Sequence, residues 1–166
     1  MLAIILLILG IFSRLITHIP NFTPVIALSL FSGVYLKRNQ AIILPLLLLA
    51  VTDLILGFHE TMAFTYSSVL IISLIGLWLK NHKNVKNITV TSLYSSIIFF
   101  AITNLGVWLA SGMYPMTASG LKECFILAIP FFKTELFSTI LYTVVFFGAY
   151  ELIASRVKKT RFAYVL

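Results

Sequence analysis

Apolar residues run continuously along most of the chain, and short polar or Pro/Gly stretches interrupt them. Because the runs are continuous rather than alternating, they are typical of helices and not of half-buried strands. The pattern predicts six helices, at residues 2–17, 24–36, 41–58, 62–79, 88–110 and 131–154. We therefore predict an all-α bundle that forms one domain over residues 1–166 and ends in a basic tail at residues 155–166.

The second of these segments, residues 24–36, is short for a helix that crosses a membrane. At about 1.5 Å per residue it spans roughly 20 Å, whereas the hydrocarbon core of a bilayer is about 30 Å thick. A segment of this length is buried among other helices, thins the bilayer or gains length from its flanks. The sequence leaves these three alternatives open.

The stretch SGMYPMTASGLKECFILAIPFFK, residues 111–133, is too long for a tight turn between two helices. It contains a short, mixed apolar segment, LKECFILAI, which is closed by Pro130. We predict an extended outer loop that holds a short helix or a partly re-entrant lid. Non-helical backbone at membrane depth needs protein or a cavity to cover it.

Composition turns the helical prediction into a membrane prediction. Hydrophobic residues make up 60% of the chain and charged residues only 10%, which is far from the balance of a soluble domain. The apolar N-terminal stretch has no basic region before it and no small-residue cleavage site after it. We therefore interpret it as a transmembrane helix rather than a signal peptide, and we expect the lipid bilayer to surround the protein.

The net charge of +7 comes from basic clusters that lie between the apolar runs. These clusters occur at alternate ends of the predicted helices: Lys37, Arg38, Lys80, Lys83, Lys86, Arg156, Lys158, Lys159 and Arg161. By the positive-inside rule, both termini face the cytoplasm. Clusters spaced in this way indicate membrane topology rather than one nucleic-acid-binding face, so no nucleic-acid partner is expected.

Four polar or charged residues fall at a similar depth, in the outer part of the predicted helices: Arg14, Asp53, Asn104 and Glu135. A charged side chain inside a membrane segment costs about 2.5 kcal/mol or more, so it is a functional-site hypothesis that needs a partner. Two interpretations remain open. The group is either a satisfied internal network that ties helices together, or the polar part of a pocket open to the outside.

The pocket interpretation gains support from aromatic, amide and other polar residues that are predicted at the same level. A few placed polar groups among apolar and aromatic walls are typical of a small-molecule site. The predicted substrate-binding residues are Arg14, Asn21, Phe22, Asp53, His59, Asn104, Trp108, Tyr114, Cys124 and Glu135.

Metal and enzyme chemistry receive little support from the sequence. His18, His59 and Cys124 are predicted on the outer side, and a lone thiolate can bind the cobalt of a cobalamin, which we keep as an alternative ligand. Yet no metal-binding spacing accompanies them, so we predict no metal and no cofactor. The chain has no Gly-rich phosphate loop and no nucleophile elbow, and Asp53 is its only aspartate, so no enzyme activity is predicted.

The stretches IPNFTPVIALSLFSGVYL, TDLILGFH, ITNLGVWL, MYP and AIPFFKTELF resemble a bacterial family of uncharacterised small membrane proteins. That family is in turn similar to the substrate-binding S components of energy-coupling factor (ECF) vitamin transporters. The resemblance implies a protein of the bacterial cytoplasmic (inner) membrane that captures a vitamin or similar micronutrient from outside. It also implies that an ECF transmembrane subunit and two ATPases drive uptake, while the S component topples in the membrane.

S components often dock through small residues of an Ala-x-x-x-Ala type in the first helix. The nearest match in this chain is Ser29-x-x-x-Gly33 in the second segment, and the first segment has no such pair. A transporter that works alone is therefore one alternative. Another is a non-transporting membrane scaffold or assembly protein, in which the buried charges only fix the packing of helices.

Overall fold

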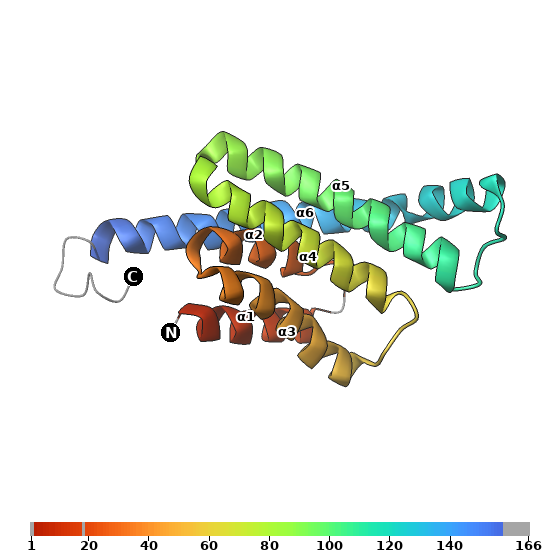
Figure 1. The fold of residues 1–166 in the computed structure, drawn as a ribbon, viewed down its shortest axis with the longest axis horizontal. Coiled ribbons are helices and arrows are strands. Elements are labelled where there is room, and N and C mark those ends of the chain that lie inside the picture. Colours follow the sequence, from red (N-terminus) through yellow and green to blue (C-terminus); the bar gives the residue numbers. More distant parts are fainter. Residues whose placement is uncertain (1, 18, 158–166) are drawn as a thin grey trace.

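The computed structural model describes residues 2–17 and 19–157, and within these ranges the chain folds into helices connected by short loops (Figure 1). No strand occurs in the described part, which confirms the all-α prediction. The elements are α1 (Leu2–Ile16), α2 (Val25–Tyr35), α3 (Arg38–Leu56), α4 (Met62–Leu79), the 3-10 helix η1 (Lys80–His82), α5 (Val85–Ala110) and α6 (Ala118–Val157).

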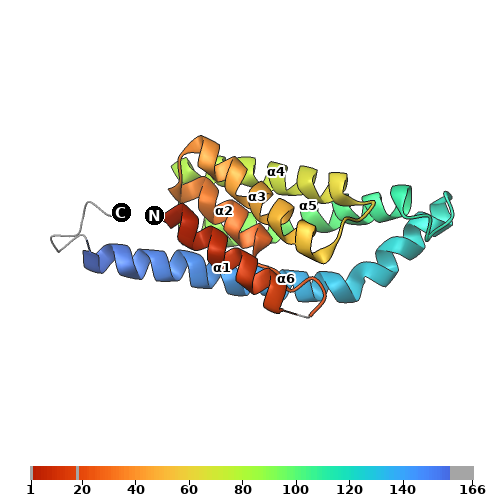
Figure 2. The same cartoon turned by 90° about the horizontal axis from the view of Figure 1, so that it is seen from below.

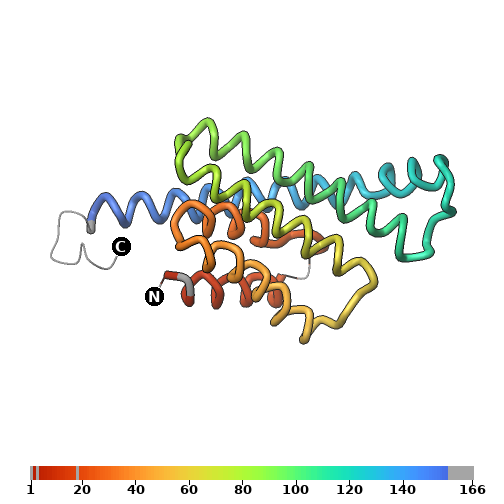
Figure 3. Tube along the Cα trace, in the orientation of Figure 1, coloured from red at the N-terminus to blue at the C-terminus, as the bar shows by residue number. Residues whose placement is uncertain are grey.

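Successive α-helices run in alternating directions, so their connections gather at two opposite ends of the described part (Figure 3). The basic end holds the start of α1, the α2–α3 and α4–α5 connections and the end of α6. The opposite end holds the connections that precede α2, α4 and α6, and we call it the pocket end because the cavity described below lies there. Most basic residues of the described part lie at the basic end: Lys37, Arg38, Lys80, Lys83, Lys86 and Arg156. This placement agrees with the alternating charge clusters of the sequence.

Helix α2 forms the centre of the bundle, although it is the shortest α-helix of the described part. Ten of its 11 residues are buried, and the helix packs against α3, α4 and α6. Because apolar residues occur all around α2, the helix suits surroundings that are apolar on every side, and the neighbouring helices provide them. Burial among other helices is thus the outcome among the three alternatives for this segment.

Helices α2 and α4 approach each other closely where Gly33 faces Gly76. A Cβ atom on Gly33 would lie 2.4 Å from the backbone carbonyl carbon of Gly76. Residues without bulky side chains permit such close approach of two helices. Ser29, one turn before Gly33, is fully buried as well. The Ser29-x-x-x-Gly33 pair therefore packs inside the protein and is not displayed on its surface.

The sixth helix differs from the prediction. A loop with a short helix or lid was expected before a helix at residues 131–154, but α6 is one helix from Ala118 to Val157 that contains Pro130. At about 1.5 Å per residue it is roughly 60 Å long. Proline removes one backbone donor and bends a helix without necessarily ending it, and Figure 2 shows α6 changing direction along its length. The expected tail at 155–166 lies beyond the described residues from position 158 onward.

Four helices of the described part, α3 to α6, are long and apolar enough to cross a membrane. Helices α1 and α2 are also apolar but shorter. Many large hydrophobic side chains of the long helices are exposed, for example Leu54, Tyr94 and Val144, each more than 60%. Exposed apolar surface of this extent suits hydrocarbon rather than water as the surroundings. The chain therefore has the character of a membrane-embedded protein.

Candidate functional site

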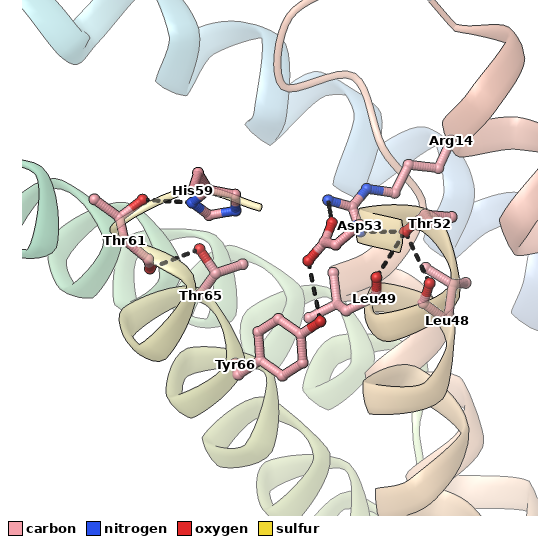
Figure 4. A network of polar contacts seen from close by, with 9 residues as sticks. All are labelled: Arg14, Leu48, Leu49, Thr52, Asp53, His59, Thr61, Thr65 and Tyr66. Atoms are coloured by element: carbon pink, nitrogen blue, oxygen red, sulfur yellow. Dashed lines mark hydrogen bonds and ion pairs between the residues drawn. The ribbon is translucent and has the colours of Figure 1, made fainter. Parts of the chain in front are cut away.

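Asp53 near the end of α3 forms an ion pair with Arg14 near the end of α1. The Arg14 Nη2 atom lies 2.8 Å from Asp53 Oδ1, and Figure 4 shows the two side chains reaching toward each other from neighbouring helices. Only 1% of the Asp53 side chain is exposed, against 18% for Arg14. The buried carboxylate of α3 thus has a cationic partner within the protein.

Two further side chains complete this network. Tyr66 of α4 donates its hydroxyl to Asp53 Oδ2 at 3.0 Å, and Arg14 Nη1 donates to Thr52 Oγ1 at 2.6 Å. Both carboxylate oxygens of Asp53 are therefore hydrogen-bonded, as a buried charge requires. The network ties α1, α3 and α4 together at the pocket end.

A cavity of about 580 Å³ lies at the pocket end. Its walls come from α1 and every other α-helix of the described part, and from the three connections at this end. Its size is in the range of about 300–1,000 Å³ that small-molecule sites occupy. Eight of the ten residues predicted for substrate binding line it: Arg14, Asn21, Phe22, His59, Asn104, Tyr114, Cys124 and Glu135. Asp53 and Trp108 are not among the lining residues.

The connections at the pocket end are shaped by residues that adopt unusual backbone angles. Gly57 ends α3 with φ of 101°, a conformation that favours glycine, and the turn that follows brings His59 to the cavity. Asn21 has φ of 60°, in the left-handed region that asparagine tolerates better than most residues. Phe22, next to it, packs its ring edge-on against Tyr142 of α6 at 5.7 Å between centroids.

Asn104, Cys124 and Trp108 hold the wall between α5 and α6. The Asn104 side chain donates to Phe100 O of its own helix at 2.8 Å, and Cys124 Sγ approaches Asn104 O at 3.4 Å. Trp108 Nε1 donates to Pro115 O at 3.0 Å and so fixes the connection that leads into α6. Trp108 was predicted as a wall of the pocket, but it is not among the lining residues, and its indole instead holds the connection before α6.

Glu135 of α6 is the lining residue with the most unusual surroundings. It is 1% exposed, and its Oε1 atom is buried without a hydrogen-bond partner among the described residues. Ser96 of α5 lies beside the carboxyl, but its hydroxyl does not reach hydrogen-bond geometry and is itself unpartnered within the described part. Native structures leave few buried polar atoms without a hydrogen-bond partner, so the unpartnered oxygen of Glu135 is a candidate for contact with a ligand.

The comparisons with known proteins bear on this chain as a whole. A family model described as "Family of unknown function (DUF6580)" matches residues 1–161. The chain belongs to this family. No curated protein and no solved structure matches it. Membership agrees with the expected resemblance to an uncharacterised family, and the cavity described above is therefore a candidate site for a member of DUF6580.

Several lining residues of this DUF6580 member were missed by the sequence analysis. They are mainly threonines near helix ends and aromatic or apolar residues within the helices: Thr17, Thr23, Thr61, Thr65, Phe99, Thr103, Val107, Leu127, Ala128 and Phe131. In a chain that is 60% hydrophobic, an apolar residue facing a cavity looks like one facing lipid. The threonines carried a usable signal, since several recur at the same end of successive helices.

His59 and Cys124, which we weighed as metal or cobalamin ligands, both line the cavity. The His59 Nδ1 atom lies 2.9 Å from Thr61 Oγ1, and Cys124 contacts the α5 backbone. His18, the third residue of that hypothesis, lies outside the described residues. Among the described residues, no group of three or more His, Cys, Asp or Glu side chains is arranged to hold a metal ion.

Proposed function

We propose that this protein is a membrane-embedded substrate-binding subunit, similar to the S components of ECF transporters, or a small transporter. It takes up a vitamin or similar micronutrient through a pocket that faces outward. The observation that carries the proposal is the cavity of about 580 Å³, which combines a few polar side chains with apolar and aromatic walls.

The direction of uptake follows from charge. The basic end holds six of the nine basic residues of the described part, and the positive-inside rule assigns such an end to the cytoplasm. The cavity at the opposite end then faces the outside of the bacterial cytoplasmic membrane. In this orientation the polypeptide crosses the membrane six times, with both termini inside.

Energy for uptake has to come from another source, because the sequence holds no nucleotide-binding motif. An ECF transmembrane subunit with two ATPases would supply it, and a protein that works alone would release its substrate down a gradient. Purification in mild detergent followed by mass spectrometry tests both parts of the proposal. Small molecules that co-purify identify the substrate, and ATPase subunits in the same sample identify the energising module.

Filling the cavity provides a direct test of binding. Ala128 is 7% exposed and lines the cavity, so Ala128→Phe is expected to occupy space that the substrate needs. We expect the affinity for the co-purifying molecule to fall at least about tenfold, the equivalent of about 1.4 kcal/mol of lost contacts. The measurement is isothermal titration calorimetry with purified protein.

The matched control for that substitution is Ile129→Phe. Ile129 is the next residue of α6 but is 45% exposed and does not line the cavity. The control should leave the affinity unchanged. Equal affinities in the wild type and both variants would show that the cavity is not the binding site.

A membrane scaffold or assembly protein is the second candidate function. It is favoured by the Arg14–Asp53–Tyr66 network, whose charges are satisfied within the protein and need no ligand. A scaffold needs no ligand in a cavity of this size, so Ala128→Phe would leave the assembly of its partner proteins unchanged. The cavity-filling variant therefore separates the two candidates.

A further inference from the structure

The charges around the cavity do not cancel. Arg14 contributes a positive charge to the wall, but Asp53 directly behind it neutralises that charge at 2.8 Å. Glu135 is the other lining residue with a full formal charge when ionised, and the described residues give it no ion-pair partner. With Glu135 ionised, the cavity and its supporting network carry one unbalanced negative charge.

The unbalanced negative charge of Glu135 is energetically important because this residue is buried. An ionised carboxylate that is 99% buried is costly unless a cation or several hydrogen-bond donors reach it. Its Oε1 atom has no such partner within the described part, although the residue lines a cavity with room for a ligand. A positively charged group in the cavity would supply the missing partner.

The neighbouring walls suit the same kind of ligand. Four aromatic side chains line the cavity: Phe22, Phe99, Tyr114 and Phe131. Aromatic faces attract organic cations through their negative quadrupole, and the attraction is stronger where water is excluded. Thr17, Thr65 and Thr103 also line the cavity, and the oxygen of a threonine hydroxyl is able to accept a hydrogen bond from a protonated amine.

From these observations we infer that the cavity binds an organic cation. The ligand is an amine with an apolar or aromatic body, and its charged group forms an ion pair with Glu135. This inference rests on the proposed function and names the chemical class of its substrate. In this inference Arg14, whose charge Asp53 neutralises from outside the cavity, is a wall residue without net charge, and Glu135 recognises the charge of the ligand.

Three probes with the same indol-3-ylethyl body and different terminal charge test the inference: tryptamine, a cation; tryptophol, its neutral alcohol; and indole-3-propionate, an anion. Each is titrated by isothermal titration calorimetry into the full-length protein in lipid nanodiscs. We expect tryptamine to bind at least about tenfold more tightly than either other probe, as a charge-assisted contact provides.

Substitutions then assign the preference to one carboxyl. Glu135→Gln keeps the shape of the side chain and removes its charge, so the advantage of tryptamine over tryptophol should disappear. Glu135→Asp keeps the charge and should retain a preference for tryptamine, which guards against a variant that merely folds poorly. Glu123→Gln is the matched control, because Glu123 is an exposed carboxylate of the same helix that does not line the cavity.

The possible outcomes are distinct. Loss of the preference in Glu135→Gln, with no loss in Glu123→Gln, supports the inference. Equal or tighter binding of the neutral or anionic probe overturns it but leaves the proposed binding function standing. If none of the probes binds, and no small molecule co-purifies, both the inference and the proposed function fail.

Discussion

Asp53→Ala is expected to lower the free energy of unfolding by about 3 kcal/mol, since breaking one side of a buried ion pair leaves an uncompensated charge. The substitution removes the acceptor 2.8 Å from Arg14 and the acceptor of the Tyr66 hydroxyl. We take the lower part of the usual range because Arg14 is 18% exposed and keeps its contact with Thr52. Unfolding in mixed micelles, followed by circular dichroism while the SDS fraction is raised, measures the change.

Two further variants identify the origin of that loss. Tyr66→Phe removes one hydrogen bond to the charged Asp53 carboxylate and should cost about 1.5 kcal/mol, half the loss expected for Asp53→Ala. The double variant Arg14→Leu/Asp53→Leu should recover much of the stability, because an apolar pair in place of a buried ion pair is often neutral or stabilising. If the double variant is less stable than Asp53→Ala, the ion pair is not what Asp53→Ala disrupts.

The Asp53→Ala variant also tests whether Asp53 contacts a ligand, when its affinity is measured beside its stability. Asp53 lies behind Arg14 and does not line the cavity, so its loss should affect a ligand only through the position of Arg14. A stability change that exceeds the change in affinity would assign Asp53 to the framework of the site. Of the two interpretations left open by the sequence, the internal network then describes Asp53 and the pocket describes Glu135.

Two local signals at helix ends were in the sequence but were not used. The prediction carried the third helix to residue 58, whereas α3 ends at Leu56 before Gly57, which has a positive φ. Asn84 caps α5 by accepting from the backbone N–H of Asn87 at 2.8 Å, so this helix begins at Val85 rather than at residue 88. The start of α6 was misplaced because Pro130 was taken as a stop signal. A single proline interior to a long helix costs one hydrogen bond, which packing on both sides of the bend can offset.

The candidate site was predicted in outline because charges are rare in a chain of this composition. Arg14, Asp53 and Glu135 stand out against apolar neighbours, and depth along the helices brought them to one level. Their different roles depend on rotation about the helix axes, which sets whether a side chain meets a partner or the cavity. The buried face of a helix is normally predicted from the periodic spacing of apolar and polar residues. These helices are apolar on nearly every side, so the sequence lacks that pattern.

Gly33→Ala is expected to lower the free energy of unfolding by at least about 3 kcal/mol, beyond the usual cost of overpacking, since the added methyl group meets backbone atoms. The new Cβ atom would lie 2.4 Å from the backbone carbonyl carbon of Gly76, and its three nearest atoms all belong to the backbone of Gly76 and Leu77, which cannot move aside as a flexible side chain can. The same SDS titration measures it. The change acts at the centre of the bundle, where α2 is covered by α3, α4 and α6.

Gly148→Ala is the matched control, and its effect should have the opposite sign. A Cβ atom on Gly148 in α6 meets nothing within 4 Å, so alanine there should add about 0.5–1 kcal/mol of helix stability. The pair also decides how the Ser29-x-x-x-Gly33 motif is used. If Gly33→Ala leaves stability unchanged but abolishes co-purification of a transmembrane partner, the motif is a docking surface. A loss of stability in the isolated protein instead assigns it to the contact between α2 and α4, and any docking to an energising subunit must then use another face.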